Sequence, residues 1–295
     1  MSVYHAGSRT VQDRVGVRGQ ADHVGRAVGD TLKPVAAAFL ELQPLLVLGA
    51  ADPVGGGVWA SPVSGAPGFV RATSPRRISV AGGVAPADPL ARALTAEGVP
   101  VGTIALDPRT RRRMRLNGRA RPTPRGLAIE ADQVFSNCPK YLQKRKSYET
   151  VADRAPGKPQ RGDELTVEQQ EFVSRADTFF LATVHADGAD VSHRGGNPGF
   201  VRAASPRELS WRDYPGNSMF LTLGNLAADP RAGLLFLDWT TGTVLQLTGE
   251  ARMEFGADGE RRVRFTVGEV VETEAAVPLR WSAPEYSPAN PDPAG

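Results

Sequence analysis

The feature of this sequence that most constrains its fold is an internal repeat. A shift of 131 positions, without gaps, places residues 61–121 on residues 192–252. The letters PGFVRA begin at Pro67 and recur at Pro198, and the letters SPR begin at Ser74 and recur at Ser205. A solenoid needs three or more shorter units. Two long copies therefore predict a gene duplication whose copies pair within one chain, as the subunits of a homodimer do.

Both copies predict the same order of secondary structure. An apolar helix comes first, at 35–42 and at 166–177. Short segments separated by Gly, Asp and Pro turns follow and are typical of antiparallel strands. A second helix is expected at 89–96 and at 218–227, before two long strands. The predicted strands are 45–50, 58–63, 68–72, 77–81, 100–107 and 112–121 in the first copy, and 178–185, 189–194, 199–203, 208–212, 232–239 and 243–253 in the second.

Short antiparallel strands with one inserted helix predict a small closed barrel, which leaves no exposed sheet edge. The expected fold class is mainly β with some α, as two tandem barrels that form an intramolecular pseudo-dimer. The first copy adds a strand at 126–130, and the alternating segment 260–280 is expected to add extra strands. The predicted parts are an N-terminal extension (1–34), a first, degenerate barrel half (35–146), a linker (147–165), a second barrel half (166–256) and C-terminal strands with a Pro-rich tail (257–295).

Composition excludes several classes of protein. The net charge of +3 is too small and too dispersed to indicate a nucleic-acid partner. No apolar run is long enough for a membrane span, and the polar N-terminus does not resemble a secretory signal. Cys138 is the single cysteine, so an internal disulfide is excluded and a cytoplasmic location is expected. The histidines and this cysteine lack metal-ligand spacing, so no metal is expected.

The two copies differ where a functional site would be expected. His193 and Arg194 end the second strand of copy two, and the matching residues of copy one are Pro62 and Val63. The loop before the second helix reads YPGNS at 214–218 in copy two and GVAPA at 83–87 in copy one. The polar residues of this pattern therefore occur in the second copy only.

These residues predict a site for one phosphate. Asn217 or Ser218 is expected to cap a helix whose free N–H groups and dipole favour an anion. Gly216 allows a close backbone approach, and Arg194 supplies a bidentate clamp. The alternative is an ordinary capped helix beside a solvated arginine, and the difference between the copies favours the site.

Five further residues are weaker candidates. The run 109–115 is basic, and the usual fate of such a run is a solvated strand face; the functional interpretation is that Arg113 reaches the phosphate held by copy two. Gln246 and Asn117 lie on equivalent strands and are candidates to bind a heteroaromatic ring edge. His193 is interpreted as a cofactor contact, with catalysis as a weaker alternative. Cys138, beside Lys140, is either a reactive thiol or a buried structural cysteine.

These segments resemble the pyridoxamine 5'-phosphate oxidase-like family of flavin-binding split-barrel proteins, over about 10–280. The motifs that carry the resemblance are SHRGGNPGF (192–200), NSMF (217–220), GNL (224–226), DPRAGLLF (229–236), LQLTG (245–249) and NCPKY (137–141). The resemblance implies two tandem split β-barrels with FMN at their interface. It departs from true pyridoxamine phosphate oxidases, because Met219 and Phe220 stand where those enzymes have a lysine, and their C-terminal tryptophan and arginine motif is missing.

The resulting hypothesis is an FMN-dependent oxidoreductase with a small-molecule redox substrate or electron donor, and with a reductase as a further candidate partner. The alternative is a non-enzymatic carrier of flavin or haem, and a deazaflavin remains an alternative cofactor. A third hypothesis is an interaction module with a degenerate site. The chain is expected to be a monomeric pseudo-dimer or a homodimer. The expected cofactor-binding residues are Ser192, His193, Arg194, Gly195, Asn217, Ser218, Met219, Arg113 and Gln246.

Overall fold

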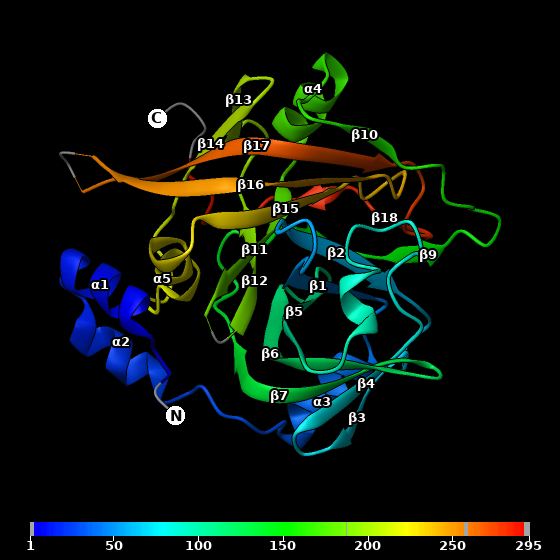
Figure 1. Ribbon diagram of the computed structural model, residues 1–295, viewed down its shortest axis with the longest axis horizontal. Helices are drawn as coiled ribbons and strands as arrows, with labels where there is room; N and C mark the ends of the chain where they lie inside the picture. The colour runs from blue at the N-terminus through cyan, green and yellow to red at the C-terminus, as the bar shows by residue number, and fades with distance from the viewer. Residues whose placement is uncertain (1–2, 187, 257–258, 292–295) are drawn as a thin grey trace.

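The computed structural model describes residues 3–186, 188–256 and 259–291, and within them the chain forms two large antiparallel sheets (Figure 1). The first sheet has seven strands in the order β2-β1-β5-β6-β7-β4-β3, and the second has the order β12-β11-β15-β16-β17-β14-β13, with β10 added beside β17. Adding ten to each label of the first order gives the second. The duplication predicted from the sequence is therefore present in the topology.

The first unit is built from helix α3 (Pro34–Glu41) and the first sheet. Its strands are β1 (Leu45–Ala51), β2 (Val58–Ser64), β3 (Val70–Ser74), β4 (Arg77–Ala81), β5 (Val99–Asp107), β6 (Arg112–Thr123) and β7 (Gly126–Ser136), with a single 3-10 turn, η1 (Ala93–Thr95), between β4 and β5. Three short strands then connect the units: β8 (Lys144–Arg145), β9 (Tyr148–Thr150) and β10 (Gln160–Gly162).

The second unit repeats this arrangement. It contains helices α4 (Val167–Arg175) and α5 (Leu221–Ala228). Its strands are β11 (Thr178–His185), β12 (Gly188–Gly195), β13 (Val201–Ser205), β14 (Glu208–Arg212), β15 (Arg231–Leu237), β16 (Val244–Phe255) and β17 (Arg261–Thr273). The short strands β18 (Leu279–Trp281) and β19 (Pro284–Glu285) pair with β9 and β8.

The structure corrects two predictions about the strands and boundaries. Strand β7 was expected to be an addition of the first copy, but β17 is its counterpart and pairs with β16 as β7 pairs with β6. Because β17 belongs to the second sheet, a second unit ending at residue 256 omits one of its strands. The sequence comparison missed the relation between β7 and β17, because a shift of 131 positions without gaps does not align these two strands.

The helix predicted at 89–96 is also wrong. Only η1 is helical there, and the segment instead forms successive tight turns such as Ala91 N–H to Asp88 O at 3.0 Å. The side chain of Asp88 fixes the start of these turns, because its Oδ1 accepts from Leu90 N–H at 2.8 Å and from Ser61 Oγ at 2.6 Å. The anchored segment buries Leu90 and Leu94 in the first barrel without a full helix.

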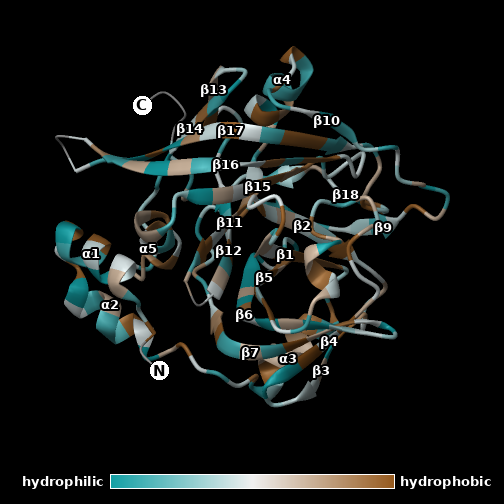
Figure 2. Cartoon of the chain, viewed as in Figure 1, coloured by the Kyte–Doolittle hydropathy of each residue, from teal (hydrophilic) through white to brown (hydrophobic). Residues whose placement is uncertain are grey.

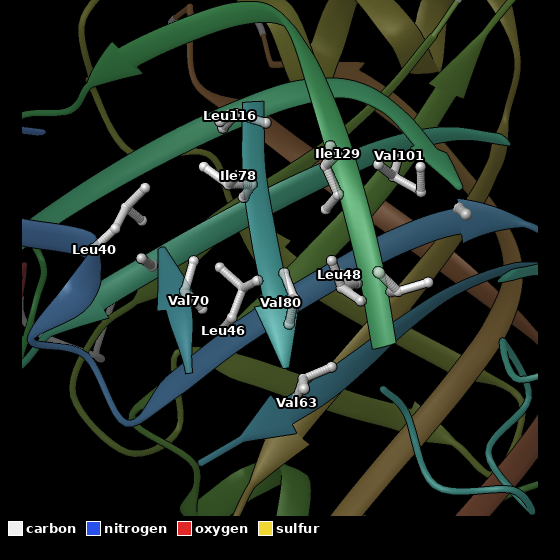
Figure 3. Packing of buried hydrophobic residues seen from close by; sticks show 14 of the residues in the cluster. Leu40, Leu46, Leu48, Val63, Val70, Ile78, Val80, Val101, Leu116 and Ile129 are labelled. Atoms are coloured by element: carbon white, nitrogen blue, oxygen red, sulfur yellow. The ribbon is translucent and has the colours of Figure 1, made fainter. Parts of the chain in front are cut away.

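Strand alternation explains why β1 is buried on both faces. Leu46 and Leu48 point into the first barrel, where they pack with β4, β6 and β7, whose side chains meet in Figure 3. Leu45 and Val47 point the opposite way and join a third core shared by both units. This shared core buries residues of β1, β2, β5, β11, β12 and β15. The units are therefore joined by a hydrophobic core, and burial of apolar surface drives their association.

Two equivalent glycines set how closely the units approach. A Cβ on Gly102 would lie 2.5 Å from the backbone of Asp190, and one on Gly233 would lie 2.7 Å from Cα of Trp59. The repeat relates Gly102 to Gly233 and Trp59 to Asp190. The seam therefore has pseudo-twofold symmetry, with β12 against β5 and β2 against β15.

Two N-terminal helices cover part of the second unit: α1 (Ala6–Val15) and α2 (Arg18–Gly25). They lie beside α5 in Figure 1, and hydrophilic and hydrophobic residues alternate along them in Figure 2. A Cβ on Gly7 would lie 2.2 Å from Gly224 O, so the backbones of α1 and α5 are in contact. Gln12 donates to Met219 O at 2.8 Å. The N-terminal extension is therefore part of the folded body.

We expect Gly102→Ala to destabilise the protein, because the added methyl group meets backbone atoms that cannot rotate away. Overpacking of this kind costs about 1–3 kcal/mol. The matched control is Gly19→Ala on α2, where no atom lies within 4 Å of the added Cβ. Urea unfolding should show a clear loss of stability for the first variant and none for the control. Equal stabilities would mean that the seam is looser than described.

Candidate functional site

A pocket opens at the seam, with walls from both units. The first unit contributes β6 and the segment that follows β7, and the second contributes the end of β12, β14 and the loop after β14. Its lining residues are Arg113, Arg115, Asn137, Cys138, Lys140, Tyr141, His193, Arg194, Gly195, Phe200, Trp211, Arg212, Asp213, Tyr214, Gly216 and Asn217. Arg113, Arg115 and Arg194 therefore converge on it from the two copies.

Arg113 reaches across the seam from β6. One terminal nitrogen, Nη1, lies 2.6 Å from Nδ1 of His193, and Nη2 donates to Cys138 O at 2.7 Å. Its buried Nε has no partner among the described residues. Burial, followed by repulsion from Arg115 and Arg194, lowers the pKa of Arg113 to about 9. It is therefore still charged near neutral pH, without a carboxylate partner in the described chain.

Arg115 is held by a buried ion pair between the units. Its Nη1 donates to Oδ2 of Asp190 at 3.0 Å, and both side chains are almost fully buried. Asn117 and Thr222 also donate to the Asp190 carboxylate, at 3.1 Å and 3.2 Å. Breaking a buried pair of this kind costs several kcal/mol, because one charge is left without a partner. Asp190 therefore fixes the position of Arg115 beside the pocket.

Arg194 enters from the end of β12 and shares its carboxylate. Its Nη2 lies 3.6 Å from Oδ1 of Asp213, whose Oδ2 accepts from Arg261 at 3.1 Å. Its Nε is buried without a described partner. Burial lowers the pKa of Arg194, and Asp213 partly opposes that shift. Since one carboxylate serves two arginines, the pocket retains a surplus of positive charge.

His193 is neutral and its tautomer follows from its partner. Burial, then the charges of Arg113, Arg194 and Arg115, lower the pKa of His193 well below its ordinary value. A guanidinium can only donate, so Nδ1 must accept from Arg113 and the ring proton lies on Nε2. This Nε2–H is buried and has no described partner. His193 therefore offers one more hydrogen-bond donor.

Unsatisfied donors are the common property of this pocket. The Nε atoms of Arg113, Arg115 and Arg194, together with Nε2 of His193, are buried and have no partner among the described residues. All four residues line the pocket. Leaving a buried donor unsatisfied costs about 1–3 kcal/mol. An anionic ligand rich in acceptor oxygens would satisfy them, so the residues present fit a phosphate group.

The loop after β14 corrects the predicted helix cap. Helix α5 begins at Leu221, and its N-cap is Phe220, which has φ 53° and makes no side-chain cap. Asn217 accepts from Met219 N–H at 3.2 Å instead of capping the helix, and Ser218 has φ 61°. Left-handed residues at 218 and 220 turn the chain away before the helix starts. Asn217 still lines the arginine pocket, and Ser218 and Met219 line the groove beside it.

The adjoining groove is lined by both polar and apolar residues. It shares Arg115, Arg194 and the loop 213–217 with the arginine pocket. Its other walls include Phe135 of the first unit and Val15 and Val17 of the N-terminal helical segment. Its remaining lining residues are Ser218, Met219, Phe220, Leu221, Thr222, Leu223 and Arg261. The cationic pocket therefore continues into a groove of mixed polar and apolar lining.

Two candidates from the sequence lie away from this pocket. Gln246 donates from Nε2 to Ala60 O, to Ser61 Oγ and to Oδ2 of Asp88, at 2.9, 3.0 and 3.1 Å. The repeat relates Gln246 to Arg115, so Gln246 belongs to the equivalent place in the other half of the seam. Ser192 is fully buried and its hydroxyl faces Leu181 O at 3.4 Å. The structure therefore does not bring Gln246 together with Arg194 at this pocket, since a pseudo-twofold axis separates equivalent strands.

The equivalent place in the first copy is closed by its own side chains. Ser61 and Gln246 both donate to Asp88, and Val63, at the position of Arg194, is buried in the first barrel. Burial raises the pKa of Asp88, partly offset by hydrogen bonds from Ser61, Leu90 and Gln246. A carboxylate at the centre of this network disfavours an anionic ligand.

Arg115, Asp190 and Asp213 were not among the residues predicted from the sequence. Arg115 lies two residues from Arg113, so strand alternation already placed both on one face. Asp190 corresponds to Trp59 in the repeat, which is the same kind of difference that revealed Arg194. No sequence signal indicated that the N-terminal helical segment would reach the groove. Within the described ranges, no cluster of three or more His, Cys, Asp or Glu could hold a metal ion.

A comparison with protein families identifies the second unit. Residues 165–289 match the model of the pyridoxamine 5'-phosphate oxidase family. The first unit repeats the strand order of the matched region. The second unit is therefore similar to the pyridoxamine 5'-phosphate oxidase family, and the first unit is a tandem copy of its topology. No curated protein matches the sequence.

The solved structures to which this chain is similar are distant from it. They include HupZ from Group A Streptococcus (14% identity, 35% of this chain and 89% of that one, TM-score 0.29). A FAD-binding protein from Mesorhizobium loti is 14% identical, and the match covers 39% of this chain and 97% of that one with a TM-score of 0.29. A pyridoxinephosphate oxidase family protein from Clostridium acetobutylicum is 13% identical, and the match covers 34% of this chain and 82% of that one with a TM-score of 0.27.

In the described part of the chain, no helix is long and apolar enough to cross a membrane.

We expect the neutral His193 to make stability depend on pH. A histidine in the unfolded chain takes up a proton below about pH 6.5, whereas the folded protein keeps His193 neutral. The free energy of unfolding should therefore fall as the pH decreases below that value, by up to about 1.4 kcal/mol per pH unit. His193→Asn, which keeps an acceptor for Arg113, should flatten this slope. The control is His23→Asn, since His23 is exposed, and this variant should keep the wild-type slope. An equal slope in the wild type and in His193→Asn would contradict the assignment of His193 as a neutral buried residue.

Proposed function

We propose that this protein is an FMN-binding oxidoreductase whose cofactor phosphate binds to Arg113 and Arg194, one from each unit. The observation that carries the proposal is the set of buried, unpaired Nε–H donors at one pocket, with more arginines than carboxylates. A phosphate dianion provides both the charge and the acceptor oxygens for these donors. The similarity of residues 165–289 to the pyridoxamine 5'-phosphate oxidase family supports a flavin as the larger ligand.

The apolar residues of the adjoining groove support a flavin more than a simple phosphate ester. Phe135, Val15 and Val17 give it an apolar wall, and it adjoins the arginine pocket through Arg115, Arg194 and Asn217. A ring bound there would be held by dispersion and by exclusion of water, while the arginines hold the charged end. The flavin supplies electron transfer when it is bound, and the protein orients it.

The tautomer of His193 separates the flavin proposal from haem binding. An iron ligand needs an unprotonated ring nitrogen. Nδ1 is occupied by Arg113, and Nε2 carries the proton. His193 is therefore arranged to donate to an anionic or carbonyl oxygen.

A deazaflavin with the same side chain would meet the same residues. Mass spectrometry of the small molecule released on denaturation distinguishes FMN from a deazaflavin.

Replacement of the two arginines should weaken FMN binding far more than riboflavin binding. Charge-assisted hydrogen bonds contribute about 1.5–3 kcal/mol each, so we expect roughly a 10- to 100-fold loss of FMN affinity for Arg113→Gln and for Arg194→Gln. Riboflavin lacks the phosphate, so its affinity should change little. The measurement is calorimetric titration of ligand-free protein with each compound.

The control for this titration is Arg252→Gln, since Arg252 lies on β16, is largely exposed and pairs only with Glu250 among the described ion pairs. It should bind FMN as the wild type does. A similar loss of affinity in all three variants would argue against the assigned pocket. Bound FMN that is never reduced, by nicotinamide donors or by chemical reductants, would favour the non-enzymatic carrier.

We also expect one FMN per chain. The equivalent place in the first copy lacks the arginine and contains Asp88 held by Ser61 and Gln246. The ratio of released flavin to protein, measured by absorbance after denaturation and by amino-acid analysis, should approach one. A ratio of two would show that the first copy also binds the cofactor.

A further inference from the structure

We propose that Cys138 is a thiolation site for small disulfides that carry negative charge, which the pocket arginines attract to its sulfur. The inference depends on the arginine pocket and does not require that the resident ligand be FMN. Cys138 is a free, exposed cysteine and it lines this pocket.

The position of Cys138 is fixed by the arginine that would attract the disulfide. Arg113 Nη2 donates to the carbonyl of Cys138 at 2.7 Å, so the guanidinium and the cysteine are neighbours. Lys140 lines the same pocket. The next residue, Tyr141, has φ 64° and its ring lies 5.1 Å from that of Tyr214 of the second unit. These contacts keep the cysteine at the seam.

Independent observations indicate that an anion belongs beside this sulfur. His193 is only 4% exposed, and its Nε2–H has no described partner. Arg113 and Arg194 each have an unpaired Nε at the same pocket. These donors are available to carboxylates of an incoming disulfide as well as to a phosphate. A cationic disulfide is repelled by the same arginines.

The reaction is ordinary thiol–disulfide exchange. The Cys138 thiol first loses its proton to solvent, and the resulting thiolate attacks one sulfur of the disulfide. A bond forms between Cys138 Sγ and that sulfur, the original S–S bond breaks, and the other half leaves as a thiolate. The disulfide is the oxidant, so no further reagent is needed. The adduct would place its negative groups among the arginines and exclude an anionic ligand.

The test compares two disulfides of opposite charge on the full-length protein. Glutathione disulfide is anionic and cystamine is cationic, and both transfer one half to a thiol by the same chemistry. Mass spectrometry of the intact protein gives the rate of each reaction. Fields of this kind change association rates by about 10- to 1000-fold. We expect the glutathione-to-cystamine rate ratio of ligand-free protein to exceed that of urea-unfolded protein at least tenfold.

Two further arms identify the arginines as the cause. Inorganic phosphate should slow the reaction of glutathione disulfide more than that of cystamine, and this arm needs no mutation. Arg113→Gln should return the ratio toward the unfolded value, whereas Arg252→Gln should not. Equal ratios in folded and unfolded protein, or a folded Cys138 that resists both reagents, would overturn the proposal.

The outcome is separable from that of the proposed function. Protein that ignores FMN but shows the charge-dependent ratio would refute the cofactor and retain the thiolation site. Protein that binds FMN at the arginines but shows no preference between the disulfides would retain the cofactor proposal and refute the thiolation site. If both hold, FMN-loaded protein should lose the preference for glutathione disulfide, because the phosphate already occupies the arginines.

Discussion

The close approach of the two sheets at Gly102 and Gly233 is the constraint on which the rest of this structure depends. Because these residues lack a Cβ, β12 can lie against β5 and β2 against β15. That contact brings β6 of the first unit within reach of β12, so Arg115 can pair with Asp190. The basic pocket exists only because two copies of one fold meet at this distance.

Duplication within one chain allowed the two halves of the seam to diverge. In one half Arg113, Arg115 and Arg194 surround a neutral histidine and retain unpaired donors. In the other half Gln246 and Ser61 satisfy a buried carboxylate at Asp88. A homodimer would carry two identical pockets, because both subunits share one sequence. The polar groups of one half therefore include unpaired donors, while those of the other half are hydrogen-bonded to one another.

Much of the fold could be predicted from the sequence, because local patterns determine it. The gapless repeat and the alternation of apolar residues located β4, β11 and β14 at their observed bounds. The counterpart of β7 and the start of α5 could not be found in this way. Left-handed backbone at Ser218 and Phe220 depends on packing that no local pattern encodes. The comparison between copies indicated Arg194 and His193. Gln246 was chosen only because its strand is equivalent to that of Asn117, and a sequence does not show which half of a pseudo-symmetric seam a strand faces.

The central claim is that both units hold one anionic group at a single pocket. A crystal structure of the protein grown with FMN tests it most directly. We predict one phosphate per chain, with its oxygens within hydrogen-bond distance of Arg113 and Arg194. Density for the phosphate against the Asp88 network, or on a surface served by one unit alone, would contradict the claim.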